Sequence, residues 1–175
     1  MKYKTAYITG EQAERQLTQQ KGTEWELAIF LALRCGLRRC ETMEFQAGDF
    51  DRAERVLHVP YRKREGCLLQ RDIQLSEKDS LRLNILATCN HNEYKYYSVR
   101  YVTDNVRRRC YHAGLTGVGL REVQHTAVSE VIMCYVREGM KVKDACEWAG
   151  YSDYSTFCNV YSAILRVAHA HAHSV

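Results

Sequence analysis

The chain has 175 residues, of which 46% are hydrophobic and 26% are charged, a composition typical of one globular domain with its own core. No stretch approaches the roughly 18 consecutive apolar residues that a membrane-spanning helix needs. The N-terminal residues 1–4 lack the apolar core of a secretory signal peptide. We therefore expect an intracellular, cytoplasmic protein without a membrane partner.

The net charge of +4 is modest, but the positive charges are clustered. Residues 62–64 and 107–109 form two dense basic triplets, either of which could be ordinary solvated surface. Two such triplets together favour a polyanionic partner, and nucleic acid is the commonest one.

The elements that the sequence predicts are mostly helices, because one proline and ten glycines leave room for long helices with compact joints. The first helix begins after Thr9, which with Gln12 forms a capping box. Thr23, Ser76 and Ser98 are the expected N-caps of three further helices. The predicted helices span about residues 10–20, 24–35, 39–45, 77–88, 99–114, 122–138 and 142–149, followed by a last helix around Tyr161 that runs toward the tail.

Two segments alternate in the manner of strands, at residues 55–59 and 67–75. A basic hairpin loop at residues 61–66 joins them. In the second segment the residues that share one face are Leu69, Arg71, Ile73 and Leu75. The expected fold is therefore mainly α with a small antiparallel β-sheet, in the α+β class.

The eight cysteines are scattered through apolar helical segments without a close C-x-x-C pair, which favours buried free thiols over disulfides. Histidines 169, 171 and 173 alternate with alanines, and in a helix such neighbours face apart. No Cys/His set has zinc-ligand spacing, so we expect no metal site.

Arg38 is the first candidate functional residue, because it lies at a junction directly after a buried helix. Arginine binds two phosphate oxygens through a planar fork and keeps its charge. Metal-free cleavage of a phosphodiester also needs an in-line nucleophile and an acid for the leaving oxygen. The alternative for Arg38 is a surface side chain paired with Glu41.

Three short motifs resemble one known family. Residues 35–41 read Cys-Gly-Leu-Arg-Arg-Cys-Glu, residues 150–152 read Gly-Tyr-Ser, and residues 159–161 read Asn-Val-Tyr. Together they resemble the catalytic domain of the tyrosine recombinases, with an ending similar to that of conjugative-transposon integrases. The resemblance covers residues 7–166 and implies that family's fold.

The resemblance also implies roles. Arg38 becomes a phosphate-binding arginine and Glu41 its supporting acid, while Tyr151 replaces a histidine that donates a hydrogen bond to the phosphate. Tyr161 becomes the nucleophile, and its distance from Gly150 selects it over Tyr154.

The basic hairpin loop is where the family places its general-acid lysine. Lys63 is the favoured candidate, although Arg62 and Arg64 leave the register uncertain by one residue. These two arginines, with Arg107 and Arg108, are the expected DNA contacts.

The second arginine of the family, in a His-x-Leu-Arg-His-Thr motif, has two registers here. Alignment on His125 and Thr126 puts Gln124 at the arginine position. Alignment on Leu120 and Arg121 keeps the arginine and displaces His125 by one turn. Arg121 is the favoured arginine, and the motif's first histidine is absent in both registers.

The resemblance implies a DNA recombinase or integrase of a mobile element, which cleaves and rejoins double-stranded DNA through a 3′-phosphotyrosine. No cofactor is required, because the covalent link conserves the bond energy, and such enzymes work as tetramers on DNA. Residues 1–175 are then one catalytic domain without the family's N-terminal DNA-clamping domain. The alternative is a catalytically impaired member that binds DNA or a partner as a scaffold, and type IB topoisomerases are a third, weaker option.

Overall fold

The computed structural model describes residues 8–62, 68–89 and 96–172. The elements, in chain order, are α1 (Gly10–Gln19), α2 (Glu26–Arg34), α3 (Arg39–Glu44), the 3-10 turn η1 (Ala47–Asp49), β1 (Phe50–Asp51), β2 (Val56–Arg62), β3 (Leu68–Gln74), α4 (Glu77–Thr88), α5 (Val99–His112), α6 (Leu120–Arg137), α7 (Val142–Trp148), α8 (Tyr154–Val160) and α9 (Ser162–Ala172). The predicted fold class, mainly α with one small antiparallel sheet, is confirmed. In the described ranges no helix is both long and apolar enough to cross a membrane.

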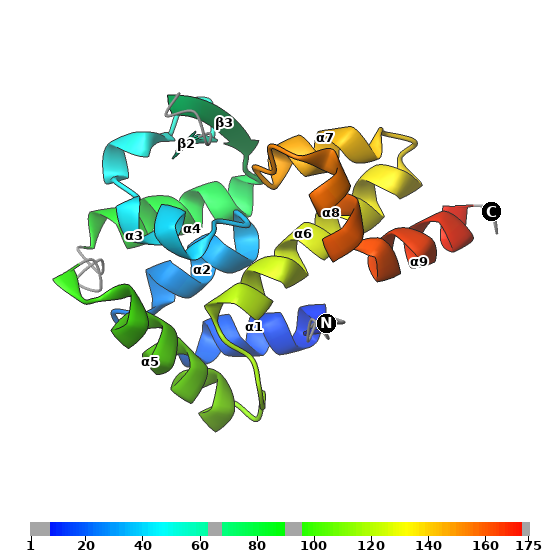
Figure 1. The fold of residues 1–175 in the computed structure, drawn as a ribbon. Helices are drawn as coiled ribbons and strands as arrows, with labels where there is room; N and C mark the ends of the chain where they lie inside the picture. The colour runs from blue at the N-terminus through cyan, green and yellow to red at the C-terminus, as the bar shows by residue number, and fades with distance from the viewer. Residues whose placement is uncertain (1–7, 63–67, 90–95, 173–175) are drawn as a thin grey trace.

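Helix α6 runs through the middle of the molecule and separates two groups of elements (Figure 1). On one side lie α2 to α5 and the sheet, and on the other lie α7, α8 and α9. Two hydrophobic clusters correspond to these groups, one around α2 and one around the second half of α6. Residues 27–33 of helix α2 are all apolar and all buried, as expected of a helix at the centre of a core.

The predicted helix starts are largely confirmed. The Thr9 hydroxyl accepts from the Gln12 backbone N–H at 3.2 Å, and the Gln12 side chain accepts from the Thr9 N–H at 2.8 Å. Ser76 and Ser98 cap α4 and α5 through their side chains. Each cap satisfies backbone donors that the first helical turn leaves unpaired.

Three details of the prediction are wrong. Thr23 does not cap α2, because its hydroxyl donates back to the Gln20 carbonyl at 2.8 Å and the helix begins after Trp25. Residues 50 and 51, which lie outside the two predicted strands, form the short strand β1. The last helix is two helices, α8 and α9, with Tyr161 at the C-cap of the first.

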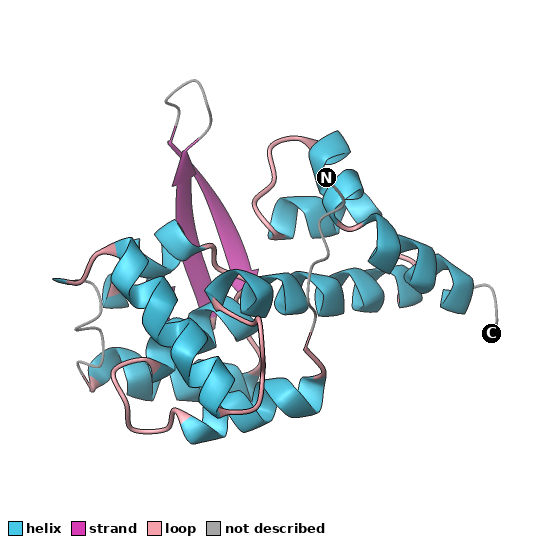
Figure 2. Cartoon of the chain, turned by 60° about the horizontal axis from the view of Figure 1, so that its bottom comes forward, coloured by secondary structure: helices cyan, strands magenta, loops and turns pink. Residues whose placement is uncertain are grey.

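The three strands pair in the order β1-β2-β3, and both pairings are antiparallel. In Figure 2 strands β2 and β3 run side by side, with helices against one of their ends. Its inner face packs on the core through Leu57, Val59 and Ile73, which are at most 3% exposed. Val59 pairs with Arg71, so the alternation of the strand turns this arginine toward the core as well.

Gly36 and Trp148 join the two groups of elements. Gly36 ends α2 in the left-handed region, with φ of 61°. A Cβ at this position would lie 2.6 Å from Trp148 Cζ3, closer than side-chain atoms approach one another. The indole of α7 therefore packs directly on the backbone between α2 and α3, which requires a glycine there.

Gly36→Ala is expected to lower the free energy of unfolding by about 3 kcal/mol or more, through backbone strain and the clash with the indole. Gly22→Ala is the matched control, because Gly22 also has positive φ (78°) but has nothing within 4 Å of its Cβ position. It carries only the backbone strain and is expected to cost about 1 kcal/mol. Equal losses in urea unfolding would contradict the importance of the Trp148 contact.

Candidate functional site

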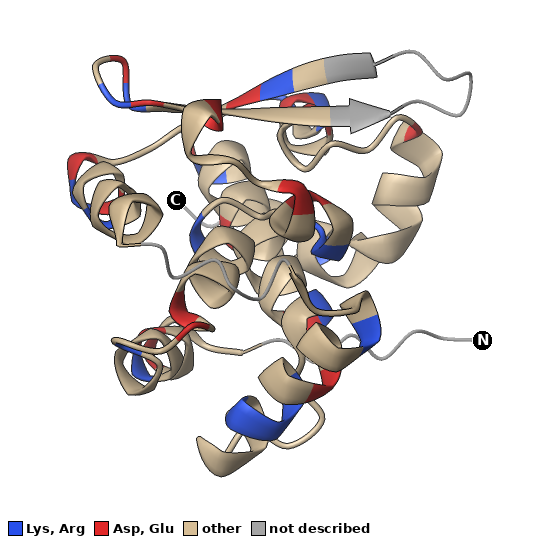
Figure 3. Cartoon of the chain, turned by 90° about the vertical axis from the view of Figure 1, so that its left-hand side faces the viewer, with Lys and Arg blue, Asp and Glu red and all other residues tan. Residues whose placement is uncertain are grey.

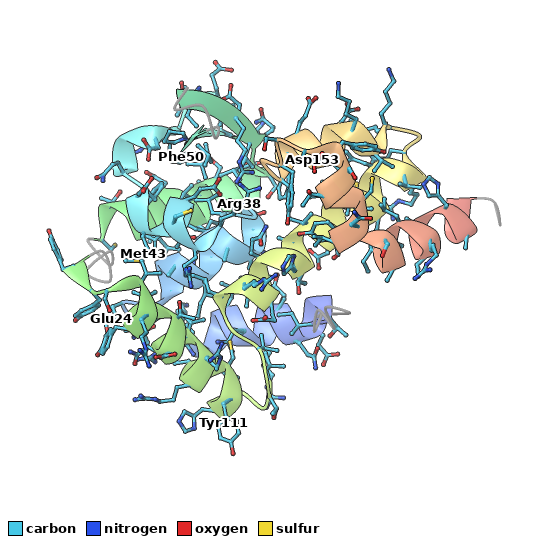
Figure 4. The ribbon with its side chains drawn as sticks, viewed as in Figure 1. Glu24, Arg38, Met43, Phe50, Tyr111 and Asp153 are labelled. Atoms are coloured by element: carbon cyan, nitrogen blue, oxygen red, sulfur yellow. The ribbon has the colours of Figure 1, made fainter. Side chains whose placement is uncertain are left out.

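Arg38 lies at the N-cap of α3 and faces the segment between α7 and α8 (Figure 4). Its backbone N–H donates to Glu41 Oε2 at 2.7 Å. Its guanidinium Nη2 donates to the carbonyls of Gly150 (2.8 Å) and Ala149 (3.3 Å). The side chain therefore crosses from α3 to the end of α7, and Glu41 holds the backbone of Arg38.

Tyr151 follows Gly150, whose φ of 69° turns the chain out of α7. The Arg38 guanidinium carbon lies 4.7 Å from the centre of the Tyr151 ring, in a cation–π contact. The same ring meets Tyr161 edge-on, with 6.0 Å between the ring centres. Tyr151 thus connects Arg38 with Tyr161.

Tyr161 is completely buried, at 0% exposure. Its ring packs against Phe157 at 4.9 Å and His125 at 5.4 Å, measured between ring centres. Its hydroxyl lies 2.7 Å from His125 Nδ1. The alternative tyrosine, Tyr154, is 47% exposed at the start of α8.

His125 links Tyr161 to Arg121. Arg121 Nε lies 3.3 Å from His125 Nε2, and because an arginine N–H only donates, Nε2 accepts. The neutral ring then carries its hydrogen on Nδ1 and donates it to the Tyr161 hydroxyl oxygen. Burial, reinforced by the charge of Arg121 and opposed by that of Glu122, lowers the pKa of His125 from 6.5 to about 4.

The two registers of the second arginine correspond to two different positions on α6. Arg121 is exposed on the first turn and directs its guanidinium to His125. Gln124 is buried at 5% exposure, and its Nε2 has no hydrogen-bond partner among the described residues. A glutamine offers no charge to a phosphate, whereas Arg121 keeps a charge next to the histidine that touches Tyr161.

The structure adds Arg71, which the sequence analysis did not single out. Its side chain is only 5% exposed, and its Nη2 donates to Glu41 Oε2 at 2.7 Å. Its Nη1 donates to the Trp148 carbonyl. The available signal was an arginine on the apolar face of a strand, because a buried charge needs a dedicated partner.

Some predicted residues are not part of this group. Lys63 and Arg64 lie outside the described residues, and the side chain of Arg62 is not described. Arg107 and Arg108 are exposed on α5. This helix lies in the lower part of Figure 3, where blue basic segments are visible. The structure therefore brings together Arg38, Glu41, Tyr151, Tyr161, His125 and Arg121.

In the described ranges, no cluster of three or more His, Cys, Asp or Glu side chains is suited to hold a metal ion. The seven described cysteines are free thiols, and three of them (Cys35, Cys110 and Cys146) are buried. The expectation that the thiols are generally buried is therefore wrong for Cys40 and Cys89, which are exposed. The group that the structure brings together consists of two arginines, two tyrosines, a neutral histidine and Glu41.

The pKa of His125 provides a direct test of this arrangement. Ring-carbon NMR is expected to give a pKa of about 4 for His125, against 6.5 for an unperturbed histidine. Arg121→Gln is expected to raise the pKa only part of the way, because burial is the larger cause. The unfolded chain binds this proton at a higher pH than the folded chain, so the free energy of unfolding is expected to fall as pH drops from 6.5 toward 4. A pKa at or above 6.5 would contradict the buried neutral ring.

No family model and no curated protein matches the sequence, but solved structures share its fold. The XerA recombinase superposes with a TM-score of 0.72 at 17% identity, covering 95% of this chain and 64% of that protein. The Tn1549 transposon integrase, in complex with transposon right end DNA, gives 0.67 at 16% identity, covering 90% and 61%. The integrase from mycobacterium phage Brujita gives 0.62 at 14%, covering 92% and 57%.

The chain thus spans less than two thirds of the length of each of these proteins. Identities this low establish the architecture rather than the activity. The order of helices around one small sheet, with Arg38 and Tyr161 joined through Tyr151, agrees with the resemblance found in the sequence. The chain has the fold of the tyrosine recombinase catalytic domain.

Proposed function

We propose that this chain is the catalytic domain of a DNA breaking and rejoining enzyme that works through a 3′-phosphotyrosine, as a site-specific recombinase or integrase does. The contact that carries the proposal is the 2.7 Å separation of the Tyr161 hydroxyl and His125 Nδ1, one aromatic ring away from Arg38. A nucleophilic hydroxyl, a titratable neighbour and a phosphate-binding cation are what metal-free transesterification requires.

In the proposed reaction the Tyr161 oxygen attacks the scissile phosphorus and the bond to the 5′-oxygen breaks. Lys63 gives its proton to that leaving oxygen. Arg38 exchanges its bonds to the Ala149 and Gly150 carbonyls for two phosphate oxygens, and Tyr151 donates a further hydrogen bond to the phosphate.

The proton of Tyr161 requires a rearrangement of His125. In the structure Nδ1 donates to the hydroxyl and Nε2 accepts from Arg121. When Arg121 turns to the phosphate it frees Nε2, the ring carries its hydrogen there instead, and Nδ1 accepts the proton of Tyr161. Because Tyr161 is completely enclosed, α8 must also move outward before attack.

A second candidate function is a non-cleaving scaffold that binds DNA or a partner recombinase. Two observations favour it. If Gln124 occupies the position of the second arginine, that position is buried and carries no charge. If Arg121 occupies it, the arginine is exposed on the surface. Loss of one transition-state donor costs about 3–4 kcal/mol of stabilisation.

The proposed partner is double-stranded DNA, on which the protein assembles as a tetramer. Support comes from the fold and from α5, whose outward positions include Arg100, Arg107 and Arg108. Tyr111, which is 63% exposed, lies at the far end of the same helix (Figure 4). Arginine and tyrosine side chains are common phosphate contacts in protein–DNA interfaces.

Covalent capture is the first test. The chain is incubated without magnesium with sheared genomic DNA of the source organism, and the mixture is denatured in SDS. DNA that remains attached is sequenced. Adducts are expected for the wild type and for Tyr154→Phe, and none for Tyr161→Phe, because only Tyr161 is the proposed nucleophile.

Adducts that persist in Tyr161→Phe would assign the nucleophile elsewhere. Absence of adducts for every variant, with retained DNA binding, would favour the scaffold. The captured sequence also identifies the target site needed for rate measurements.

The basic face of α5 is tested by salt dependence. Arg107→Gln with Arg108→Gln is expected to weaken binding of duplex DNA and to reduce the slope of log K against log salt by about 2, one per lost phosphate contact. Arg137→Gln with Lys141→Gln removes the same charge near the other end of α6, about 24 Å from Arg121 at 1.5 Å per residue. An equal effect of both pairs, measured by fluorescence anisotropy, would show that only net charge matters.

A further inference from the structure

We propose that Arg71 is the positioning residue of this site: it joins Glu41 of α3 to the C-terminal end of α7 and thereby sets Arg38 and Tyr151 relative to each other. The inference rests on the proposed function of Arg38.

The pair connects three segments through Glu41 Oε2 and the guanidinium of Arg71. Glu41 Oε2 accepts from the Arg38 backbone N–H and from Arg71 Nη2, both at 2.7 Å. Arg71 also donates from Nη1 to the Trp148 carbonyl. Strand β3, the start of α3 and the end of α7 are therefore joined by adjacent hydrogen bonds.

The end of α7 explains why two arginines meet there. The last carbonyls of a helix have no intrahelical partner, and the helix dipole favours cations beside them. The carbonyl of Trp148 is taken by Arg71, and those of Ala149 and Gly150 by Arg38. Three successive carbonyls thus hold two guanidinium groups side by side.

The close approach of Arg71 also accounts for the glycine in the turn. A Cβ on Gly150 would lie 2.9 Å from Arg71 Nε, and the φ of 69° already disfavours other residues. The Gly-Tyr-Ser turn is therefore shaped around the side chain of Arg71. The backbone of this turn sets the position of the next residue, Tyr151, whose ring contacts the Arg38 guanidinium.

Stability alone does not account for a charged pair in this position. Burial lowers the pKa of Arg71, because the guanidinium loses its contacts with water, and Glu41 raises it. A buried ion pair is often no more stabilising than apolar residues of the same size. The neighbours of Arg71 on the inner face of the sheet, Leu57 and Ile73, are apolar.

The pair also leaves Arg38 free to accept an anion. Without Arg71, the carboxylate of Glu41 would attract the guanidinium of Arg38. This is the Arg38–Glu41 pairing that the sequence offers as the alternative role of Arg38. With Arg71 on Glu41, the described side-chain contacts of Arg38 are the carbonyls of Ala149 and Gly150 and the ring of Tyr151, all of them uncharged groups. Neutral carbonyls release a guanidinium to a phosphate more readily than a carboxylate does.

The test uses two variants of the pair. Arg71→Met with Glu41→Gln removes both charges together, so neither is left buried alone. Arg71→Lys keeps the charge and loses the planar fork. The matched control is Arg82→Met with Glu26→Gln, which removes another ion pair, one that joins α4 to α2.

Covalent adduct formation is timed on the captured DNA site, with a normal scissile phosphate and with a neutral methylphosphonate there. The double variant is expected to fold and to react about 100-fold more slowly on the phosphate, the scale of a misplacement of about 1 Å. The methylphosphonate is neutral and needs less charge from Arg38. On it the loss of rate in the double variant is expected to shrink below about 5-fold, and the loss of rate in Arg38→Ala is expected to shrink in the same way. Arg71→Lys is expected to recover part of the rate, and the control to match the wild type.

A loss of equal size on both substrates, or a wild-type rate in the double variant, would overturn the proposal. If the wild type forms no adduct, the proposed function fails and the positioning claim is tested separately by NMR. The Arg38 guanidinium and Tyr151 ring signals are then expected to shift in the double variant and in Arg71→Lys, but not in the control. Unchanged signals in both Arg71 variants would overturn the positioning role.

Discussion

Trp148 belongs to both hydrophobic clusters, and its contact with the backbone at Gly36 is the constraint on which the site depends. The indole approaches so closely that no side chain fits at position 36. This contact brings the end of α7 to the start of α3. The guanidinium of Arg38 can then reach the carbonyls after Trp148, and the tyrosines that follow α7 come to lie beside it.

Much of the fold was predictable, because local signals and packing agree. Thr9, Ser76 and Ser98 supply side-chain caps that need no tertiary context. Residues 27–33 of α2 are all apolar, a pattern typical of a core helix. The break between α8 and α9 was not predictable, since no proline or glycine lies between residues 151 and 172. It follows from the packing of the Tyr161 ring among Tyr151, Phe157 and His125.

The site was predictable to the extent that it consists of contiguous motifs. Arg38, Tyr151 and Tyr161 were selected from short motifs, and the structure places them side by side. Arg71 was not selected, because its partners Glu41 and Trp148 are 30 and 77 residues away in the sequence. The role of His125 also depends on tertiary structure, since the partner of its Nδ1 is 36 residues away. Periodicity reveals that a position is buried, but not which distant group it meets.

The register of the hairpin fixes how far each strand position lies from the core and which face of the sheet it occupies. Arg71 is held by the core at the pair Val59–Arg71, and the strands stay paired as far as Arg62–Leu68, about 10 Å further along at 3.3 Å per residue. Inserting two residues into each strand beyond Arg71 would keep its side chain inward and carry the end of the ladder about 7 Å outward. Inserting one residue between Arg71 and Ile73 would turn one of the two to solvent. Changes in strand length between Arg71 and Ile73 should therefore come in steps of two, because an odd step there would turn the arginine that holds α7 away from the core.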